Sequence, residues 1–339
     1  MVSYDAPPHY GGMGRHVGSL IDALRACGIT VELFDRSSRP IATTYGRHLS
    51  FSIGLSGALS RWAAQKDIHM LHIHAGPGGV FLPAPPLPCV VTANHTYIQQ
   101  SSMPGESWKK IFLPLERSTY QAACAIACIS TDTAKSVTES YGVPEGKILT
   151  IPCGFDVLPW IQADTDDREA YHCIFVGRPD VRKGYDILLR AWKHVIKAYP
   201  HARLHLVGVS GHDTNSLKFY RRVSDDVLRT MVGRARCLIA PSRLEGFGLA
   251  AAEAIAAGTP VIATNVDGLR TVVSHGLTGL LSGCDAFQLA HNISRLFSDD
   301  VLWKTLHEGC QSVRHGFSET VEAHAYASLY SRVYSSLHA

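Results

Sequence analysis

The segment from Arg236 to Ala263 limits the fold more than any other part of the chain, because two apolar runs in it enclose a glycine turn and a helical run. The run from Arg236 to Ser242 predicts a strand, and the residues up to Ala257 predict a helix. Gly258 then predicts the helix stop, and a second buried strand follows it. This is a β-α-β unit. Ligands of such units bind beyond the carboxyl ends of the strands, so the loop before the helix is expected to lie at a ligand site.

Two glutamates flank the start of this helix. Glu245 lies in the loop, and Glu253 follows eight positions later inside the helix. The backbone amides of Phe247, Gly248 and Leu249 at the helix amino terminus favour a phosphate. The two acids are placed to accept hydrogen bonds from hydroxyl groups on either side of a diphosphate. By itself such a pair is typical of surface helices, so the interpretation depends on the other motifs.

A second motif follows the apolar strand Cys173–Val176, about 65 residues upstream. Gly177, Arg178 and Lys183 place two cations at the carboxyl end of this strand. An arginine forks onto two oxygens and a lysine supplies a point charge, which suits a diphosphate. The neighbouring Arg182 is interpreted as a solvated charge.

Two further features belong to the first half of the chain. Gly11, Gly12 and Gly14 form a glycine loop that leads into a helical run, and such a backbone can approach a phosphate or a sugar ring closely. His95 follows the strand Cys89–Thr92. Taken alone, this residue is typical of a loop histidine at a strand end.

Together these motifs resemble the retaining GT-B glycosyltransferases of glycosyltransferase family 4, also called glycosyl transferases group 1. The resemblance runs nearly from end to end. It implies two doubly wound, Rossmann-like α/β domains that face each other across a cleft, with a carboxyl-terminal helix that crosses back to the first domain. The expected parts are an acceptor-side domain over residues 1–160, a nucleotide-sugar-binding domain over 161–315, and the crossing helix over 316–339.

The resemblance also assigns roles to single residues. Arg178 and Lys183 would bind the diphosphate and stabilise the charge that grows on it, and Glu245 would hold hydroxyls of the transferred sugar. Glu253 would bind the ribose, and His95 would lie near the reaction centre. Arg178, Lys183, Glu245 and His95 are therefore the expected catalytic residues. The expected substrate-binding residues are Gly11, Gly12, Gly177, Phe247, Gly248, Leu249 and Glu253.

The implied reaction transfers a hexose from a UDP- or GDP-linked donor to an acceptor hydroxyl, with retention, in glycan, polysaccharide or glycolipid biosynthesis. Family members are described as using front-face attack, in which the leaving phosphate takes the proton. We expect no cofactor and no metal in this chemistry, since no carboxylate pair for a metal lies beside the diphosphate loop. The acceptor stays open between a sugar, a lipid-linked molecule and a small metabolite.

Three places depart from the family pattern. Only Met1 to Tyr4 precede the glycine loop region, which predicts a stunted first strand. The stretch between Gly208 and Val223 is short, so a helix that flanks the base pocket is expected to be missing. The usual Gly-Gly-x-x-Glu has become Asp267-Gly268-x-x-Thr271, which leaves the role of that glutamate unfilled.

Composition agrees with a two-domain globular enzyme of 339 residues, 46% of them hydrophobic and 18% charged. A net charge of +3 suggests no nucleic-acid partner, and nine cysteines without a C-x-x-C pair suggest reduced core residues. Because no apolar run approaches about 18 residues, we expect a cytoplasmic protein. Expected strands of the first half are Thr30–Asp35, Met70–His74, Pro88–Thr92 and Ala125–Ile129, and a last helix spans Ser318–Leu337.

Two patterns allow a second interpretation. His69, His72 and His74 suggest a metal, but a third ligand of fitting spacing is missing, and His74 at the strand end is instead a candidate for lining the acceptor cleft. The apolar stripe that begins at Trp108 and Ile111 is typical of core packing. Its alternative is a surface that meets the inner face of a membrane.

Two other functions compete. Gly12-x-Gly14-x-x-x-Gly18 followed by Asp35 resembles a dinucleotide fingerprint, which indicates an NAD(P)-dependent oxidoreductase. That hypothesis leaves the two-glutamate segment and the cations unexplained. The other is a catalytically inactive nucleotide-sugar-binding protein, which the presence of both cations disfavours.

Overall fold

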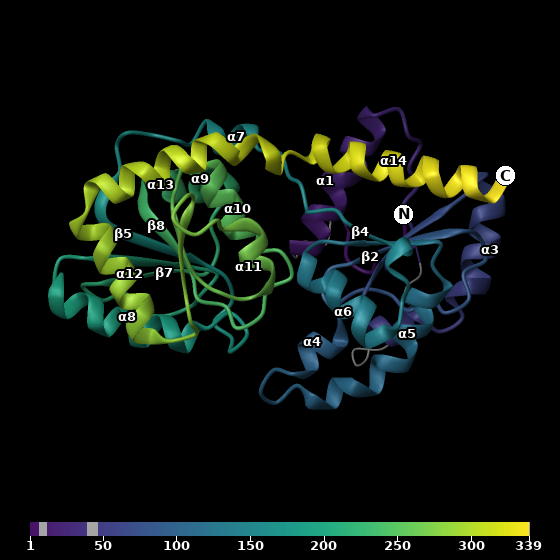
Figure 1. Cartoon of the computed structure of the whole chain (residues 1–339), viewed down its shortest axis with the longest axis horizontal. Helices are drawn as coiled ribbons and strands as arrows, with labels where there is room; N and C mark the ends of the chain where they lie inside the picture. Colours follow the sequence, from purple (N-terminus) through teal and green to yellow (C-terminus); the bar gives the residue numbers. More distant parts are fainter. Residues whose placement is uncertain (7–11, 39–46, 339) are drawn as a thin grey trace. The chain divides into compact units, whose positions relative to one another are not determined.

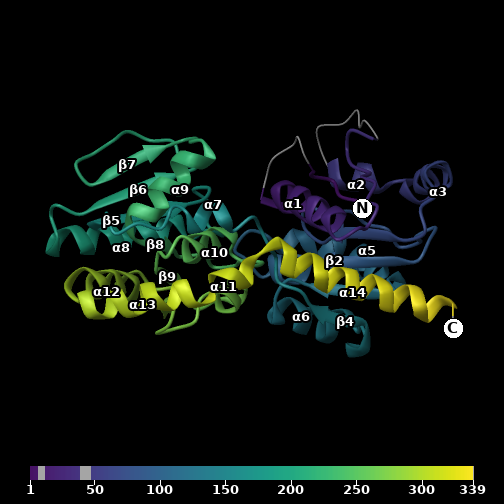
Figure 2. The same ribbon diagram turned by 90° about the horizontal axis from the view of Figure 1, so that it is seen from above.

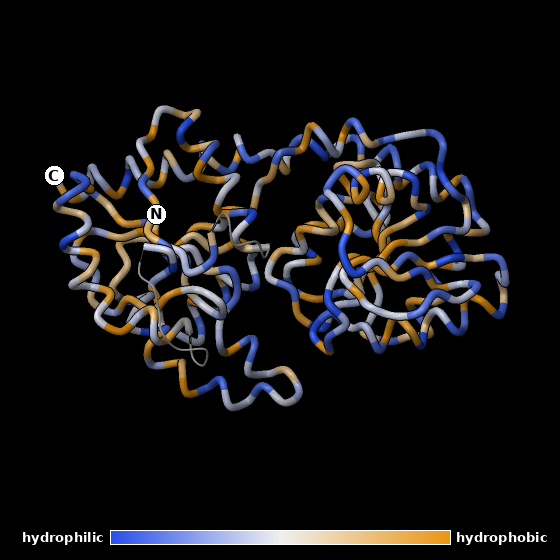
Figure 3. Tube along the Cα trace, turned by 180° about the vertical axis from the view of Figure 1, so that it is seen from behind, coloured by the Kyte–Doolittle hydropathy of each residue, from blue (hydrophilic) through white to orange (hydrophobic). Residues whose placement is uncertain are grey.

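The computed structural model describes residues 1–6, 12–38 and 47–338. The chain forms two compact units, one of residues 1–155 with the segment from Glu319 onward, and the other of residues 156–318 (Figure 1). Apolar stretches gather along the strands inside each unit, and hydrophilic stretches run along the outer turns (Figure 3).

The amino-terminal unit contains a parallel sheet of four strands in the order β1-β2-β3-β4. Every residue of the first three strands is buried, because helices cover both faces of the sheet. The strands expected from residue 70 onward are confirmed. Their bounds are β1 (Leu71–Ala75), β2 (Cys89–Ala93), β3 (Ala125–Cys128) and β4 (Ile148–Thr150).

The strand expected over Thr30–Asp35 is wrong. Val2 makes single parallel bridges to Phe34 and to Ile73, and no longer ladder forms there in the described chain. The backbone bonds between this neighbour and the segment are confined, among the described residues, to Phe34 and to the Glu32 carbonyl, which accepts from the Met1 amino terminus. The Asp35 carboxylate then accepts bonds from the amides of the two serines at 37 and 38, which turns the chain away.

The helices of this unit follow local capping signals. Thr96 and Gln99 form a capping box, and Ser130 caps a later helix. Trp108 and Ile111 are 55% and 67% exposed, so their expected packing in the core is wrong. The elements are α1 (Gly12–Ala26), α2 (Arg47–Ser52), α3 (Leu55–Lys66), α4 (Tyr97–Ser101), η1 (Ser107–Phe112), α5 (Leu113–Ala122), α6 (Thr131–Tyr141) and η2 (Glu145–Lys147).

The carboxyl-terminal helix α14 (Glu319–His338) packs on α1 and belongs to the amino-terminal unit, as expected (Figure 1). Two of its tyrosines make buried bonds to the sheet. The Tyr326 hydroxyl lies 2.6 Å from Thr92 Oγ1, and the Tyr330 hydroxyl lies 2.6 Å from His72 Nδ1. Buried hydroxyls need such partners, so these bonds fix how the helix sits on the sheet.

The carboxyl-terminal unit contains a parallel sheet of six strands in the order β10-β9-β8-β5-β6-β7. Helices lie on both sides of this sheet, as Figure 2 shows, which makes the unit doubly wound. The strands are β5 (Glu169–Val176), β6 (Arg203–Val207), β7 (Leu217–Tyr220), β8 (Ala235–Ala240), β9 (Val261–Thr264) and β10 (Gly279–Ser282). The helices are α7 (Leu158–Ile161), α8 (Tyr185–Ala198), α9 (Asp225–Arg234), α10 (Leu249–Ala256), α11 (Asp267–Val272), α12 (Ala286–Ser298), α13 (Asp300–Val313) and η3 (Arg314–Phe317).

The order of these strands reverses between β5 and β8. From β5 the chain continues to β6 and β7 on one side, and it then returns to β8 on the other. Residues 208–216 join β6 to β7 as a loop, so the connection expected to lack a helix does lack one. Within the described ranges, no helix combines the length and apolar character needed to cross a bilayer.

Candidate active site

The loops that follow β5 and β8 lie side by side at this switch point. The Arg243 amide donates to the Arg182 carbonyl at 2.8 Å, which joins the two loops. Gly184 has a φ of 65°, and a Cβ atom there would lie 1.8 Å from the Pro241 carbonyl oxygen. Only glycine fits this close approach, so the sequence itself holds the two loops together.

Lys183 and Glu245, predicted from separate motifs, meet across these loops. Lys183 Nζ lies 2.6 Å from Glu245 Oε2, and the Ser242 hydroxyl donates to the same oxygen at 3.2 Å. The Lys183 and Glu245 side chains are 21% and 12% exposed. Because the pair is partly desolvated and charge-assisted, it is stronger than a surface ion pair.

A small hollow of about 20 Å³ lies beside this pair, which is room for roughly one water molecule. Lys183, Glu245 and Gly248 all line it. The structure thus brings one expected cation, one expected acid and the start of α10 to a single place at the carboxyl ends of β5 and β8.

The amino terminus of α10 opens at this place. Gly248 caps the helix with a φ of 96°, and a Cβ atom there would lie 2.9 Å from Leu269 Cδ2. The amides of Ala251 and Ala252 bond to the Gly248 carbonyl. The amides before them, those of Leu249 and Ala250, have no intrahelical acceptor in an α-helix, so they suit an anionic oxygen.

Two other expected residues lie in the same β-α-β unit with buried side chains. The Phe247 side chain is 3% exposed and supports the turn, so only its backbone is suited to a ligand. Glu253 lies inside α10 and is 8% exposed. A buried carboxylate on this helix, beyond the phosphate-binding end, agrees with a role in holding a polar group of a nucleotide, which stays a prediction.

Arg178 is not part of the Lys183 cluster. Its side chain is 76% exposed, and its Nε lies 3.6 Å from Asp180 Oδ2. Gly177 before it donates its amide to the Val207 carbonyl at 2.9 Å, and a Cβ on Gly208 would lie 2.7 Å from the Gly177 carbonyl oxygen. The loop base is therefore fixed while the arginine extends into solvent.

Arg182 is a site residue that the sequence interpretation missed. Its Nη1 lies 3.7 Å from Glu245 Oε1 and 3.3 Å from the Leu244 carbonyl oxygen, and its side chain is only 22% exposed. Its interpretation as a solvated charge is therefore wrong. Its place directly before Lys183 in a loop with two glycines was the one available signal.

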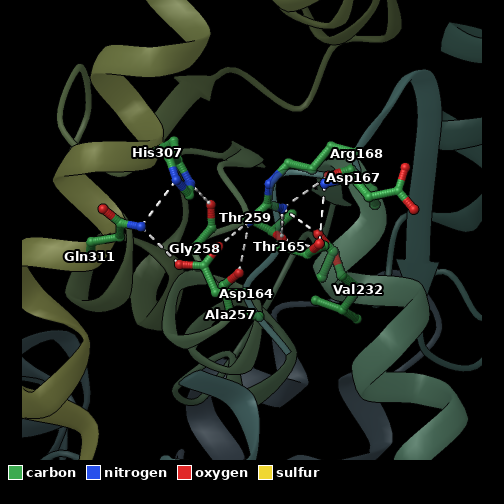
Figure 4. Close-up of polar contacts among 12 residues, drawn as sticks. Asp164, Thr165, Asp167, Arg168, Val232, Ala257, Gly258, Thr259, His307 and Gln311 are labelled. Atoms are coloured by element: carbon green, nitrogen blue, oxygen red, sulfur yellow. Dashed lines mark hydrogen bonds and ion pairs between the residues drawn. The ribbon is translucent and has the colours of Figure 1, made fainter. Parts of the chain in front are cut away.

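The carboxyl end of α10 is anchored by a buried network, shown in Figure 4. Arg168 donates to the Ala257 carbonyl at 3.0 Å and to Asp164 Oδ1 at 2.6 Å. Gln311 donates to Asp164 Oδ2 at 2.9 Å. Burial alone would raise the pKa of Asp164, but the bonds from Gln311 and Arg168 outweigh it and lower the pKa. The network satisfies carbonyl groups that the helix end leaves unpaired.

The remaining expected residues belong to the amino-terminal unit. Gly12 is the first residue of α1, and Gly11 lies outside the described residues. His95 follows β2, and a Cβ on Gly76 would lie 2.5 Å from its carbonyl oxygen. His74 is fully buried, so the hypothesis that it lines a cleft is wrong. The role of His95 near the reaction centre stays a prediction.

A larger hollow of about 720 Å³ lies in the amino-terminal unit between α14 and the amino-terminal end of β1. Its lining includes Ile29, Met70 and Tyr334, and none of the expected site residues that the structure describes. Ligands of parallel α/β sheets bind at the opposite, carboxyl ends of the strands. Size alone therefore does not make this hollow the active site.

Comparison with known proteins agrees with the motifs. The family model described as Glycosyltransferase Family 4 matches residues 10–157, and the model described as Glycosyl transferases group 1 matches residues 170–299. The phosphatidyl-myo-inositol mannosyltransferase of Mycolicibacterium smegmatis is 26% identical over 335 residues, which cover 88% of this chain and 84% of that protein.

Solved structures show the same fold. The sucrose-phosphate synthase of Thermosynechococcus elongatus superposes with a TM-score of 0.78 at 21% identity, covering 99% of this chain and 96% of that one. HepE of Anabaena, solved in complex with UDP and glucose, gives a TM-score of 0.64 at 16% identity, over 91% and 88% of the two chains. Both likenesses establish the architecture with two parallel sheets.

Proposed function

Because the chain belongs to the group 1 glycosyltransferases of family 4 and has the GT-B fold, we propose that its carboxyl-terminal unit binds a nucleoside-diphosphate hexose at the Lys183–Glu245 pair. The protein transfers the sugar to an acceptor hydroxyl with retention of configuration. The pairing of Lys183 with Glu245, next to the open amides of α10, is the observation that carries this proposal.

The geometry supports a separate role for each of these groups in binding the donor. We assign the diphosphate to the amides of Leu249 and Ala250 and to the Lys183 ammonium group, because helix amides and a fixed cation stabilise negative charge. Glu245 is assigned to the hexose, which follows the β-phosphate. Glu253, farther along α10, is assigned to the ribose, which follows the α-phosphate.

Transfer then proceeds as the bond between the anomeric carbon and the β-phosphate oxygen breaks. Lys183 and the helix amides stabilise the charge that develops on the leaving diphosphate. The acceptor hydroxyl bonds to the anomeric carbon on the same face, and its proton passes to the leaving phosphate oxygen. This route needs neither an enzyme nucleophile nor a metal.

The oxidoreductase hypothesis is less well supported. Its candidate ribose-binding residue, Asp35, is 3% exposed. One oxygen of its carboxylate accepts bonds from the amides of Ser37 and Ser38 and from both their hydroxyls. An acid used in this way to close a turn is poorly suited to bind a ribose.

Calorimetric titration tests the donor site. UDP or GDP is expected to bind, and NAD is not. Lys183→Ala should lower the affinity for the nucleoside diphosphate. Lys193→Ala, an exposed control on α8, should leave this affinity unchanged. Tight NAD binding without diphosphate binding would overturn the proposal. Turnover of a panel of UDP- and GDP-hexoses separates an active enzyme from an inactive binding protein.

For the acceptor, we propose a lipid-linked molecule at a membrane surface. The support is the exposed pair Trp108 and Ile111 on η1, beside the exposed Lys110. An aromatic and an aliphatic residue next to a cation suit the boundary of an anionic bilayer. Cosedimentation with anionic vesicles should fall in Trp108→Ser/Ile111→Ser, and equal cosedimentation of both proteins would contradict this assignment.

A further inference from the structure

Three side chains of the kind that bind metals meet inside the amino-terminal unit. They are His16 of α1, Cys153 before the unit boundary, and Glu322 of α14. Their ligand atoms all lie within 4.8 Å of one another, and all three residues are buried. His16 Nε2 lies 2.7 Å from Glu322 Oε1, although 306 positions separate the two residues in the sequence.

The spacing fits a tetrahedral ion. Bond lengths of about 2.0–2.3 Å to nitrogen, oxygen and sulfur place the ligand atoms of zinc roughly 3.4 Å apart. The observed separations, from 2.7 Å to at most 4.8 Å, bracket this distance. The Gly154 amide donates to Glu322 Oε2 at 2.8 Å, which orients the carboxylate as an outer-shell partner does in metal sites.

A fourth residue, His74 on β1, gives an independent indication. It is fully buried, and neither of its ring nitrogens has a hydrogen-bond partner among the residues that the structure describes. Buried polar atoms without partners are rare and point to a missing ion or water. Its ring stands edge-on to that of His16, with the centroids 6.1 Å apart. Two imidazoles that share a zinc ion have centroids about 5 Å apart, so His74 must move toward His16 to join the set.

The stacked neighbour His72 is already bonded to Thr92 and Tyr330, so it is not a candidate.

We propose that His16, Cys153, Glu322 and His74 bind one divalent transition-metal ion of the zinc type. The mixed nitrogen, sulfur and oxygen donors favour zinc over magnesium or calcium, which prefer oxygen alone. One thiolate and one carboxylate cancel the charge of a divalent ion, so the buried site is neutral overall.

The ion is structural. All four ligands are buried, which leaves no open position for a substrate. It joins α1, β1, the segment before the unit boundary and α14, and so fastens the carboxyl-terminal helix to the amino-terminal unit. The chemistry at Lys183 belongs to the other unit and does not use it.

Metal analysis of the full-length protein tests the site. Protein purified without metal-binding tags and dialysed against metal-free buffer should hold close to one equivalent of zinc by plasma mass spectrometry. After exchange with cobalt, it should show the visible bands of a tetrahedral ion and a thiolate-to-cobalt charge-transfer band in the near ultraviolet. Less than a tenth of an equivalent of any transition metal, together with no cobalt bands, would overturn the proposal. His16 and Glu322 would then share a proton in place of a metal ion.

Variants assign the ligands. Cys153→Ser and Glu322→Gln should each lower zinc retention at least tenfold, and the cobalt protein of Cys153→Ser should lose the thiolate band. The matched control is Cys89→Ser, a buried thiol of β2 whose Sγ faces the Ala122 carbonyl at 3.8 Å, and it should retain the metal. Equal zinc in Cys153→Ser and wild type would refute the assignment. If the variants do not fold, the cobalt spectrum of the wild type still decides it.

Discussion

Lys183 Nζ lies 2.6 Å from Glu245 Oε2, while Arg182 Nη1 lies 3.7 Å from the other oxygen of the same carboxylate. Glu245 is therefore shared between two cations. In the proposed function, Lys183 turns from Glu245 to the donor diphosphate, and Arg182 remains as a partner of the carboxylate. Glu245 is then placed to accept hydrogen bonds from sugar hydroxyls.

Lys183→Ala is expected to lower turnover about 100–1000-fold at saturating donor, because it removes a charge that stabilises the leaving diphosphate. Steady-state kinetics with the active nucleotide sugar measure this loss. Lys193→Ala serves as the control for removing a lysine from the same unit. A variant at Lys183 with near-native turnover would show that this cation does not act on the reaction.

Glu253→Gln and Glu245→Gln should separate nucleotide binding from sugar binding. A hydrogen bond to a charged acceptor contributes about 1.5–3 kcal/mol. Glu253→Gln should therefore lower the affinity for the free nucleoside diphosphate roughly 10–100-fold. Glu245→Gln should leave this affinity nearly unchanged and lower turnover. Calorimetry measures both, and equal losses of nucleotide affinity in the two variants would contradict the assigned roles.

Arg168→Ala should destabilise the carboxyl-terminal unit by about 1.5–3 kcal/mol, because it removes an arginine that pairs with Asp164, while Arg314 remains, and it leaves the end of α10 without its donor. Hydrogen–deuterium exchange in α10 and β8 measures the change. Arg190→Ala, which removes an exposed ion pair on α8, should cost less than about 1 kcal/mol. Unchanged protection of α10 in Arg168→Ala would show that the network in Figure 4 does not hold the helix.

Glu116 should make the stability of the amino-terminal unit depend on pH. Burial raises its pKa from 4.5 to about 7, although Tyr141, the Tyr97 amide and Tyr120 donate hydrogen bonds to it. The folded state therefore holds the proton more tightly than the unfolded state. The resulting stabilisation is complete below pH 4.5 and is lost as the pH rises through 7.

The free energy for opening this unit should consequently fall by about 2–3 kcal/mol between about pH 5 and pH 8. Hydrogen exchange of α5 and β3 at the two pH values measures it, after correction for the intrinsic exchange rate. Glu116→Gln cannot titrate and should show a flatter profile. The same pH dependence in wild type and variant would mean that Glu116 does not carry it.

Much of the fold follows from local sequence. Strands such as Ile126 to Cys128 are apolar at every position, which predicts burial on both faces, and Gly258 marks the end of α10. The strand expected over Thr30–Asp35 failed because a strand also needs a partner along its length, and its neighbour pairs through Val2 alone. The strand propensity of a segment does not reveal whether such a partner is present.

In the candidate site, too, local sequence predicts some features, while others depend on residues that are distant in the sequence. Glycines, cations and acids near the strand ends identify the loops, because their spacing is local. Arg182 was missed because its partner, Glu245, lies in a different loop, far away in the sequence. The cluster of His16 and Glu322 spans nearly the whole chain, so no spacing rule can reveal it.

The stereochemistry of transfer tests the central claim most directly, because it depends on the whole site at the Lys183–Glu245 pair. Proton NMR of the product's anomeric centre, with an α-linked nucleotide hexose that proves active, reports it. We expect an α-linked product, formed on the face that the diphosphate leaves. A β-linked product would contradict it, since inversion requires a general base on the opposite face, with His95 the first residue to examine by His95→Ala.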